Sequence, residues 1–377
     1  MQNNAIISAK DISVGYGRIT VAGGISFDIN AGEILTIIGA NGAGKSTILK
    51  TIAAQLPIMS GAAYIDGKNI SSINEKSMAK QISLVLTERI CSERMTCRDI
   101  IATGRYPYTG RLGILSGKDS EIVDEAMELA GISHLKDRDF RFISDGQRQC
   151  VMIARAIAQQ PTAMLLDEPT SFLDIDRKLE LLTLLRKLSK EKNIAVIQTL
   201  HELDLAQRFS DKILCIKNKK ADKLGIPEDI FTDEYITNLY GIKNGNFNGL
   251  YGVAEPTGIS GDPLIYVIGG GGTGINLYRR LWRLGIPFAA GILHENDIEI
   301  PVAKVLAAQL ITEKAFEPIC QKSIEKSLEA IKRCRHVVCC ISGFGTINSA
   351  NKTLVETAEK MGKIISAEEI NDTYLQR

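Results

Sequence analysis

A glycine-rich segment close to the N-terminus has the composition and spacing of a phosphate-binding loop. It follows the apolar run Ile34–Ile38 and leads into a helical pattern that starts at Lys45. Glycines allow backbone N–H groups to turn toward phosphate oxygens, and the following helix adds the positive end of its dipole. We expect Lys45 to reach the β- and γ-phosphates and Ser46 to hold Mg²⁺. The predicted nucleotide-binding residues of this loop are Gly39, Ala40, Asn41, Gly42, Ala43, Gly44, Lys45, Ser46 and Thr47.

Two adjacent carboxylates after a second apolar run supply chemistry that a phosphate loop alone lacks. Asp167 and Glu168 directly follow the run Ala163–Leu166. Asp167 is placed to support Mg²⁺ through a water, and Glu168 to polarise the attacking water as a general base. Paired acids also occur in ordinary turns, but the phosphate loop earlier in the chain favours the catalytic interpretation. Together the two segments predict a P-loop ATPase that uses ATP and Mg²⁺.

Further segments, in order along residues 5 to about 240, resemble motifs of the ATP-binding cassette (ABC) family. They are the aromatic segment Gly15–Gly17, the signature-like segment Ile143–Gln149, the loop Ser171–Asp174 and the segment Thr199–Glu202. The resemblance implies that Tyr16 stacks on adenine. It also implies that His201 contacts the γ-phosphate and keeps Glu168 and the attacking water in line.

The signature-like segment implies a partner for this chain. In the ABC family this segment binds the γ-phosphate held by the opposite subunit, so Ser144, Gly146 and Gln147 are expected to act in trans. The resemblance therefore implies a head-to-tail dimer with two ATP molecules at its interface. Asp145 stands where a glycine is commoner in the family. We expect its side chain to point away from the triphosphate, because a carboxylate there would oppose the helix dipole.

A second departure from the family pattern concerns the residue that senses Mg²⁺. Glu88 follows the run Ser83–Leu86 at the place where the family usually has glutamine. A carboxylate would bind Mg²⁺ more strongly but would repel the phosphate oxygens. We therefore expect Glu88 to join Ser46 and Asp167 at the metal, with slower or more Mg²⁺-dependent hydrolysis.

The segment Gly104–Gly110 resembles one that is typical of ATPases serving iron–siderophore, haem and cobalamin importers. The other interpretation is a surface loop whose aromatic residues are plain anchors. The importer resemblance implies integral-membrane permease subunits as partners and, through them, an extracytoplasmic substrate-binding protein. The alternative function is a soluble ATP-dependent regulatory switch that is not coupled to transport.

Composition and charge exclude some classes of protein function and location. The chain has 377 residues and a formal net charge of +1, which argues against non-specific nucleic-acid binding. We find no apolar stretch near the ~20 residues that span a bilayer, and no signal-peptide pattern at the N-terminus. We therefore expect a cytoplasmic protein that is held at the inner face of the cell membrane by its permease.

Alternating buried strands and helices predict an α/β fold with a mainly parallel sheet, and a change in texture predicts two domains. We expect a P-loop ATPase domain with a helical subdomain at residues 1–245, a linker at 246–262 and a smaller Rossmann-like domain at 263–377. In the second domain, Gly269, Gly271 and Gly274 fit the dinucleotide fingerprint between a strand and a helix.

The ligand of this second domain is open at the level of sequence. A pyrophosphate at the glycines would call for an acidic residue at the end of the next strand, where Glu295 and Asp297 come slightly late. The interpretations are a bound nucleotide or dinucleotide, a structural or oligomerising domain whose glycines only permit tight packing, or another ligand, including the transported substrate.

Overall fold

The computed structural model describes residues 5–86, 94–110 and 113–370 and divides into two compact units. The first unit comprises residues 1–240 and the second residues 241–377. Each unit has its own sheet and its own hydrophobic core. The two are described separately below.

The strands β9, β3, β8, β7 and β6 lie side by side in that order in the first unit and all run parallel. They comprise Lys212–Lys217 (β9), Ile34–Gly39 (β3), Ala195–Thr199 (β8), Ala163–Leu166 (β7) and Ile82–Val85 (β6). β3, β7 and β8 are buried along their whole length, which explains why their sequences are mostly apolar. Because parallel strands end at the same edge, the residues that follow these three strands are brought together.

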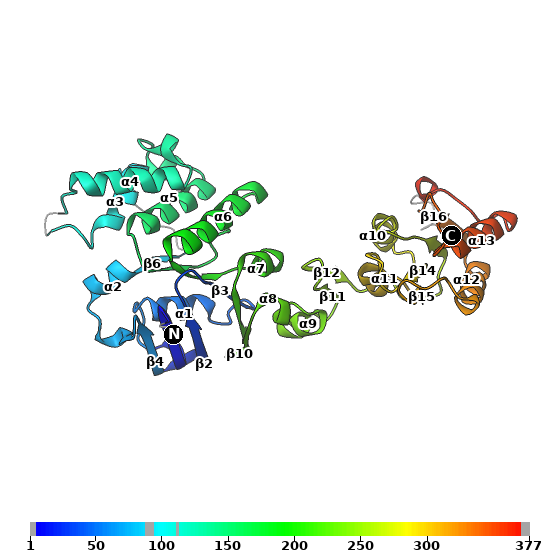
Figure 1. Ribbon diagram of the computed structural model, residues 1–377, viewed down its shortest axis with the longest axis horizontal. Helices are drawn as coiled ribbons and strands as arrows, with labels where there is room; N and C mark the ends of the chain where they lie inside the picture. The colour runs from blue at the N-terminus through cyan, green and yellow to red at the C-terminus, as the bar shows by residue number, and fades with distance from the viewer. Residues whose placement is uncertain (1–4, 87–93, 111–112, 371–377) are drawn as a thin grey trace. The chain divides into compact units, whose positions relative to one another are not determined.

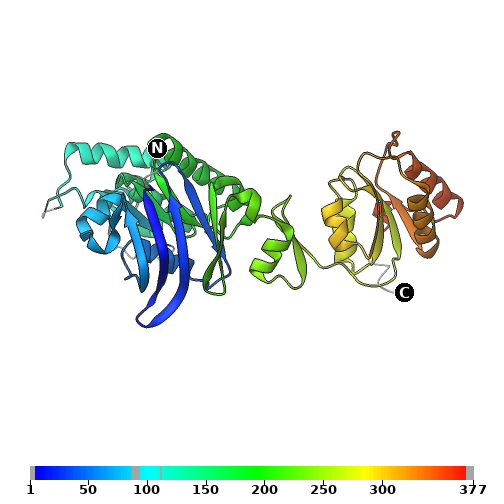
Figure 2. The same cartoon turned by 60° about the horizontal axis from the view of Figure 1, so that its bottom comes forward.

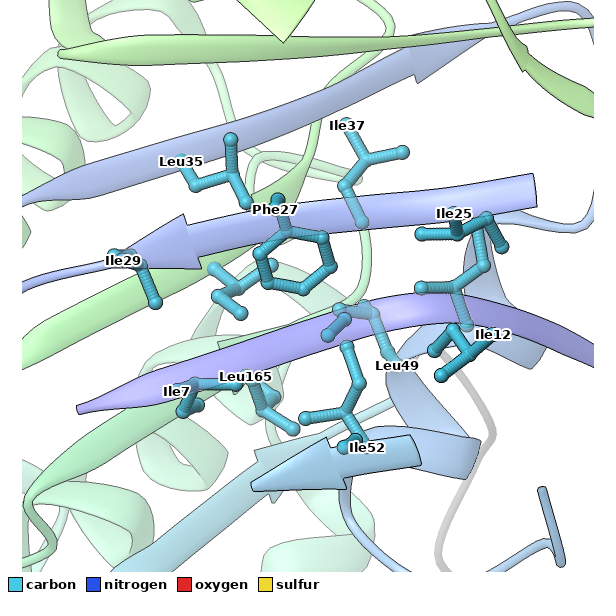
Figure 3. Close-up of a cluster of buried hydrophobic side chains, with 14 of the residues drawn as sticks. Ile7, Ile12, Ile25, Phe27, Ile29, Leu35, Ile37, Leu49, Ile52 and Leu165 are labelled. Carbon is cyan, nitrogen blue, oxygen red and sulfur yellow. The ribbon is translucent and has the colours of Figure 1, made fainter. Parts of the chain in front are cut away.

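Five strands extend the same sheet on the other side of β9, and all their pairings are antiparallel except the parallel pairing of β10 with β2. They comprise Ile7–Tyr16 (β1), Ile19–Ile29 (β2), Ser60–Ile65 (β4), Lys68–Asn69 (β5) and Lys220–Gly225 (β10). Figure 2 shows the long strands β1 and β2 in blue. Side chains from β1, β2, β3, β7 and the helix Lys45–Ile52 (α1) point toward one another in a common core, as Figure 3 shows. Phe27 of β2 is only 3% exposed there, and burying such a side chain stabilises the fold by roughly 1.5–3 kcal/mol.

Helices of the first unit cover this sheet and form a separate helical group. The helices α3, α4 and α5 pack on one another and lie together in Figure 1. These three comprise Cys97–Ala102, Gly117–Leu129 and Asp145–Ala158. The remaining helices are Lys45–Ile52 (α1), Glu75–Gln81 (α2), Ile175–Lys192 (α6), Leu203–Phe209 (α7), Pro227–Ile230 (α8) and Asp233–Tyr240 (α9).

The main sheet of the second unit is parallel, with strand order β15-β14-β13-β16. Numbered within the unit this is the order 3-2-1-4, which is the start of the doubly wound arrangement. The strands comprise Ile265–Ile268 (β13), Phe288–His294 (β14), Gln309–Glu313 (β15) and His336–Cys339 (β16). The expectation of a second, smaller α/β domain is thereby confirmed.

Helices cover both faces of this second sheet (Figure 2). Ile265 and Val267 face the cluster that contains residues of α10 and α11, whereas Tyr266 and Ile268 face α12 and α13. This alternation is the period of two that a strand imposes on its side chains. The helices comprise Ile275–Arg283 (α10), Ile300–Leu306 (α11), Gln321–Arg333 (α12) and Ser349–Lys360 (α13).

The residues expected to form a linker, 246–262, differ from that description in the structure. Gly245–Asn248 (β11) and Val253–Pro256 (β12) pair as an antiparallel hairpin, which contacts α11 and belongs to the second unit. The side chain of Asn248 accepts N–H groups of Leu250 and Tyr251, so the polar residues that suggested a loop form the turn of the hairpin. None of the described helices is both long and apolar enough to cross a membrane.

Candidate active site

The predicted phosphate loop lies between the end of β3 and the start of α1, as the sequence requires. A side chain at Gly39 would place its Cβ 2.4 Å from the carbonyl oxygen of Ile216 on β9, so only glycine fits. Gly44, directly before α1, has a φ of 100°, a value that side-chain-bearing residues rarely adopt. The loop thus starts and ends at positions that require glycine.

The side chain of Lys45 is almost fully buried, and its amino group hydrogen-bonds the backbone of the phosphate loop itself. Its Nζ donates to the carbonyl oxygens of Gly39 and Ala40 at 2.8 and 3.2 Å. Burial lowers the pKa of Lys45, and the nearby charges of Glu168 and Asp167 act in the opposite direction. A desolvated ammonium group next to a glycine loop is arranged to bind phosphate oxygens strongly.

The two adjacent carboxylates stand at the end of β7, beside the end of β8. Thr199 is fully buried there, and its hydroxyl group connects them. It donates to Oδ1 of Asp167 at 2.8 Å and accepts the backbone N–H of Glu168 at 2.8 Å. One side chain on the neighbouring strand therefore fixes the position of both acids.

Glu168 is held from three directions. His201 Nε2 lies 2.5 Å from its Oε1, and Ser171 donates to its Oε2 at 3.2 Å. Its backbone has a φ of 48°, a left-handed conformation that costs a non-glycine residue about 1–3 kcal/mol at functional sites. The N–H bond to Thr199 helps to hold this strained conformation. A carboxylate beside an imidazole in such a fixed geometry can accept a proton from a water.

The donor set at this edge of the sheet suits Mg²⁺. Hard oxygen ligands are what Mg²⁺ prefers, with waters completing the octahedron. Thr199 uses Oδ1 of Asp167, and among the described contacts Oδ2 accepts no hydrogen bond. Ser46 supplies a hydroxyl at the first turn of α1, next to Lys45. Glu88 lies outside the described residues, so its part in the metal site stays a prediction.

Tyr16 was predicted to contact the nucleotide, whereas Tyr240 contacts the phosphate loop without having been predicted. Tyr16, the predicted adenine contact, ends β1 and is 50% exposed, so its ring is accessible to a ligand. The hydroxyl of Tyr240 accepts the N–H of Gly39 at 3.2 Å, and burial raises its pKa to about 12. Sequence reasoning missed Tyr240, because nothing in the pattern around residue 240 places it at the loop.

The signature-like segment forms the start of α5. Ser144 caps the helix: its hydroxyl accepts the N–H of Gln147 at 3.2 Å, and Gln147 Oε1 accepts the N–H of Ser144 at 3.0 Å. Asp145 makes an ion pair with Arg148 at 2.8 Å on the same helix. Gly146 packs against the loop that contains Phe172, whose oxygen would lie 3.2 Å from an added Cβ.

The segment Gly104–Gly110 packs into the helical group. Arg105 is 5% exposed and binds Asp119 and the carbonyl oxygen of Ala158 at 2.9 and 2.8 Å. Its guanidinium lies 4.0 Å from the ring centre of Tyr108. Tyr106 is 58% exposed. The aromatic residues are thus both anchors and accessible surface.

The second glycine loop differs from what a pyrophosphate site requires. The N–H groups of Gly270 and Gly274 donate to Glu299, and that of Gly271 donates to Asp297, all at 2.8 Å. Asp297, one of the two acids that come slightly late for a ribose, binds the loop. The possible ligand site at Gly269, Gly271 and Gly274 stays a prediction, and carboxylates of the protein accept the N–H groups of Gly271 and Gly274.

Replacing Thr199 with valine is expected to lower kcat about 10-fold with little change in KM. The backbone N–H of Glu168 and Oδ1 of Asp167 would each lose a hydrogen-bond partner. A rise of about 1.4 kcal/mol in the activation free energy is enough to lower kcat 10-fold. Steady-state ATP hydrolysis measures the effect. Thr357→Val, which removes an exposed hydroxyl in α13, is the matched control and should leave kcat unchanged. Equal activity of both variants would contradict the bridging role of Thr199.

Comparisons with known proteins agree with this geometry. Residues 22–171 match the ABC transporter family, and residues 288–375 match a family described only as MJ0874. An uncharacterised ABC transporter ATP-binding protein of Methanocaldococcus jannaschii, MJ0873, is 46% identical over 280 residues, which are 73% of this chain and 96% of that protein. The ferric enterobactin transport ATP-binding protein FepC of Escherichia coli is 35% identical, over 63% of this chain and 88% of its own.

Among solved structures, an ABC transporter described as being of the metal-chelate type, in an inward-facing conformation, is similar in fold. Its TM-score is 0.56 at 28% identity, over 63% of this chain and 89% of that chain. Both this likeness and the resemblance to FepC are confined to less than two thirds of the present chain. The phosphate loop, the paired carboxylates and the relative that is matched over nearly its full length agree: the chain belongs to the ABC transporter ATP-binding protein family and is an ATPase.

Proposed function

We propose that two copies of this chain bind and hydrolyse ATP between them. Lys45 would bind the β- and γ-phosphates, Glu168 would accept a proton from the attacking water, and His201 would hold Glu168 in place. The observation that carries this proposal is the contact of 2.5 Å between His201 and Glu168, because it joins a base to the group that orients it. Mg²⁺ held by Ser46 and Asp167 would neutralise the charge that develops on the phosphates.

The second copy would contribute the N-terminus of α5. Ser144, Gly146 and Gln147 would there offer a hydroxyl and backbone N–H groups to the γ-phosphate. Large apolar side chains near this segment support the presence of a covering surface, since they are strongly exposed in the single chain. Phe142 is 82% exposed, Phe172 69% and Ile175 79%.

We further propose that a membrane permease docks beside the helical group. A groove of about 850 Å³ lies between the segment that follows α1, the helix α2, the strand β6 and the end of α5, and its lining includes Leu56, Ile73, Met78 and Arg155. Burial lowers the pKa of Arg155, and no ion pair joins it to a carboxylate of the described residues. A groove of mixed polar and apolar lining that contains a largely desolvated guanidinium suits a short helix that carries an acidic residue. Gly104 lies directly against Arg155, so the importer-like segment borders this groove.

The transported substrate is proposed from the likenesses. FepC is named for ferric enterobactin transport, and the solved transporter for metal chelates. We therefore propose import of an iron–siderophore, haem or cobalamin-type substrate, delivered by an extracytoplasmic binding protein. The chain itself would sit at the inner face of the cell membrane and would contact the permease and its second copy, but not the transported substrate.

Co-purification tests the importer proposal. Tagged full-length protein, solubilised from native membranes in mild detergent, should recover a polytopic membrane protein in comparable amounts. Pro57→Arg, at the exposed rim of the groove, should lose this partner while ATP binding persists. Leu179→Arg places the same side chain at an exposed position of α6 away from the groove and should retain the partner. If wild type recovers no membrane protein, the alternative of a soluble ATP-dependent switch is favoured.

A further inference from the structure

The glycine loop of the second unit resembles a dinucleotide site in sequence but not in its contacts. Residues Gly269–Gly274 connect β13 to α10. In a dinucleotide site of this topology, the loop N–H groups and the helix N-terminus face a pyrophosphate. Here the same donors face two carboxylates that come from the segment before α11.

Glu299 occupies the centre of the loop. It is fully buried, and its Oε1 accepts the N–H groups of Gly270 and Gly274 at 2.8 Å each. Its Oε2 accepts the hydroxyl of Tyr278 at 2.6 Å. Burial, with the charge of Glu299, raises the pKa of Tyr278 well above its usual value, so this hydroxyl stays a donor. A buried carboxylate is tolerated only when its oxygens are satisfied in this way.

Asp297 accepts one further donor of the loop. Its Oδ2 accepts the N–H of Gly271 at 2.8 Å, and its Oδ1 accepts the N–H of Glu299 at 2.9 Å. Two linked anionic groups therefore sit on the loop, as the two phosphates of a pyrophosphate would. A further phosphate group close to either carboxylate would be repelled, because like charges oppose each other.

The glycines make room for Glu299. An added Cβ would lie 2.3 Å from Oε2 of Glu299 at Gly269 and 2.6 Å from it at Gly274. The fingerprint spacing is thus explained by a close-packed internal side chain. It does not require a ligand.

The phosphate loop of the first unit provides the contrast within the same chain. It has Lys45 beside it, and among the described contacts no carboxylate accepts an N–H group of residues 40–46. The phosphate loop of the first unit is therefore accessible to an anionic ligand and lies beside a cation. The glycine loop of the second unit already binds the carboxylates of Glu299 and Asp297.

We infer that the glycine loop of the second unit is an anion site which the chain occupies itself: Glu299 and Asp297 replace a pyrophosphate, fasten α10 to α11 and prevent the loop from binding nucleotide or dinucleotide phosphates. The second unit keeps the strand order of a dinucleotide-binding domain while its phosphate donors are used for folding. Any ligand of this unit must be held by other groups.

Hydrogen–deuterium exchange on the full-length protein tests this inference, with the phosphate loop as internal control. ATP with Mg²⁺ should slow exchange in peptides that cover residues 39–47 at least 10-fold. NAD⁺, NADP⁺, FAD and ATP at 1 mM should each leave peptides that cover 269–274 unchanged. Protection of residues 269–274 by any of these compounds would overturn the inference.

Removing Glu299 should convert the filled site into an empty one. In Glu299→Ala, exchange at residues 270–278 should rise at least 10-fold, and 100 mM acetate or phosphate should reverse most of that rise. Glu295→Ala, at an exposed acid of the same segment, should show neither effect. Glu299→Gln keeps the size and the acceptor for Gly270 and Gly274, so it should fold and exchange within about 3-fold of wild type. Unchanged exchange in Glu299→Ala, or no response to either anion, would overturn the inference.

Discussion

Glu168→Gln is expected to lower kcat about 1,000-fold while ATP binding remains, the factor that a general base contributes. Glutamine can still accept the hydroxyl of Ser171 and can contact His201, so the local geometry should persist. It cannot accept a proton from the attacking water. The variant should therefore accumulate as an ATP-bound dimer, which single-turnover kinetics and gel filtration with ATP would detect.

A charge-matched control separates this effect from a general loss of an acid. Glu180→Gln removes a carboxylate that pairs with Arg177 on the exposed face of α6. Exposed ion pairs contribute little to stability, so this variant should hydrolyse ATP at the wild-type rate. If Glu168→Gln retains more than a tenth of wild-type kcat, Glu168 is not the general base.

The second large effect concerns the two halves of the site. Lys45→Ala should weaken ATP affinity about 100-fold, because it removes the cation that bonds the phosphates. Ser144→Arg should leave ATP binding near wild type but should abolish hydrolysis, because it places a bulky side chain where the opposite copy's γ-phosphate is expected. Equilibrium binding of a fluorescent ATP analogue and steady-state hydrolysis distinguish the two defects.

Matched controls exist for both substitutions. Lys50→Ala removes a lysine from the last turn of the same helix, α1, and should leave ATP affinity unchanged. Ser116→Arg removes the cap and capping box of α4, as Ser144→Arg does for α5. Loss of a cap costs about 1 kcal/mol, so both serine variants should lose similar stability. Only Ser144→Arg should lose activity.

The sequence predicted those parts of the site whose residues lie next to one another along the chain. The phosphate loop and the pair Asp167 and Glu168 each follow a strand that is fully buried and mostly apolar. Such strands are recognisable because they are buried on both faces, and parallel neighbours end at one edge. The α/β fold with a P-loop and a second, smaller parallel sheet was predictable for the same reason.

What sequence could not supply were contacts between distant segments. Thr199 belongs to a recognised segment, but its hydrogen bonds to Asp167 and Glu168 depend on the pairing of β7 with β8.

Two elements were also not predicted from the sequence. The strand β15 is short and of mixed burial, so its periodic signal is weak. The 18-residue helix α6 was missed as well, although its buried leucines recur at helical spacing.

The second glycine loop shows how a motif can keep its spacing and still lack the expected ligand. Its glycines fit the dinucleotide fingerprint, and only the fold reveals that Glu299, 25 residues after Gly274, fills the position of the phosphates. A local pattern records the conformation of the backbone and does not record which anion stabilises it. The distinction requires tertiary contacts.

Mixing the two inactive variants tests most directly the central claim that ATP is hydrolysed between two copies. Random pairing of Lys45→Ala with Ser144→Arg makes about half of the dimers mixed, and each mixed dimer has one intact site. If ATP is hydrolysed between two copies, the equimolar mixture should recover up to about a quarter of wild-type hydrolysis, while each variant alone stays near zero. A mixture that is no more active than its components, or full activity of Ser144→Arg alone, would contradict hydrolysis at a two-chain interface.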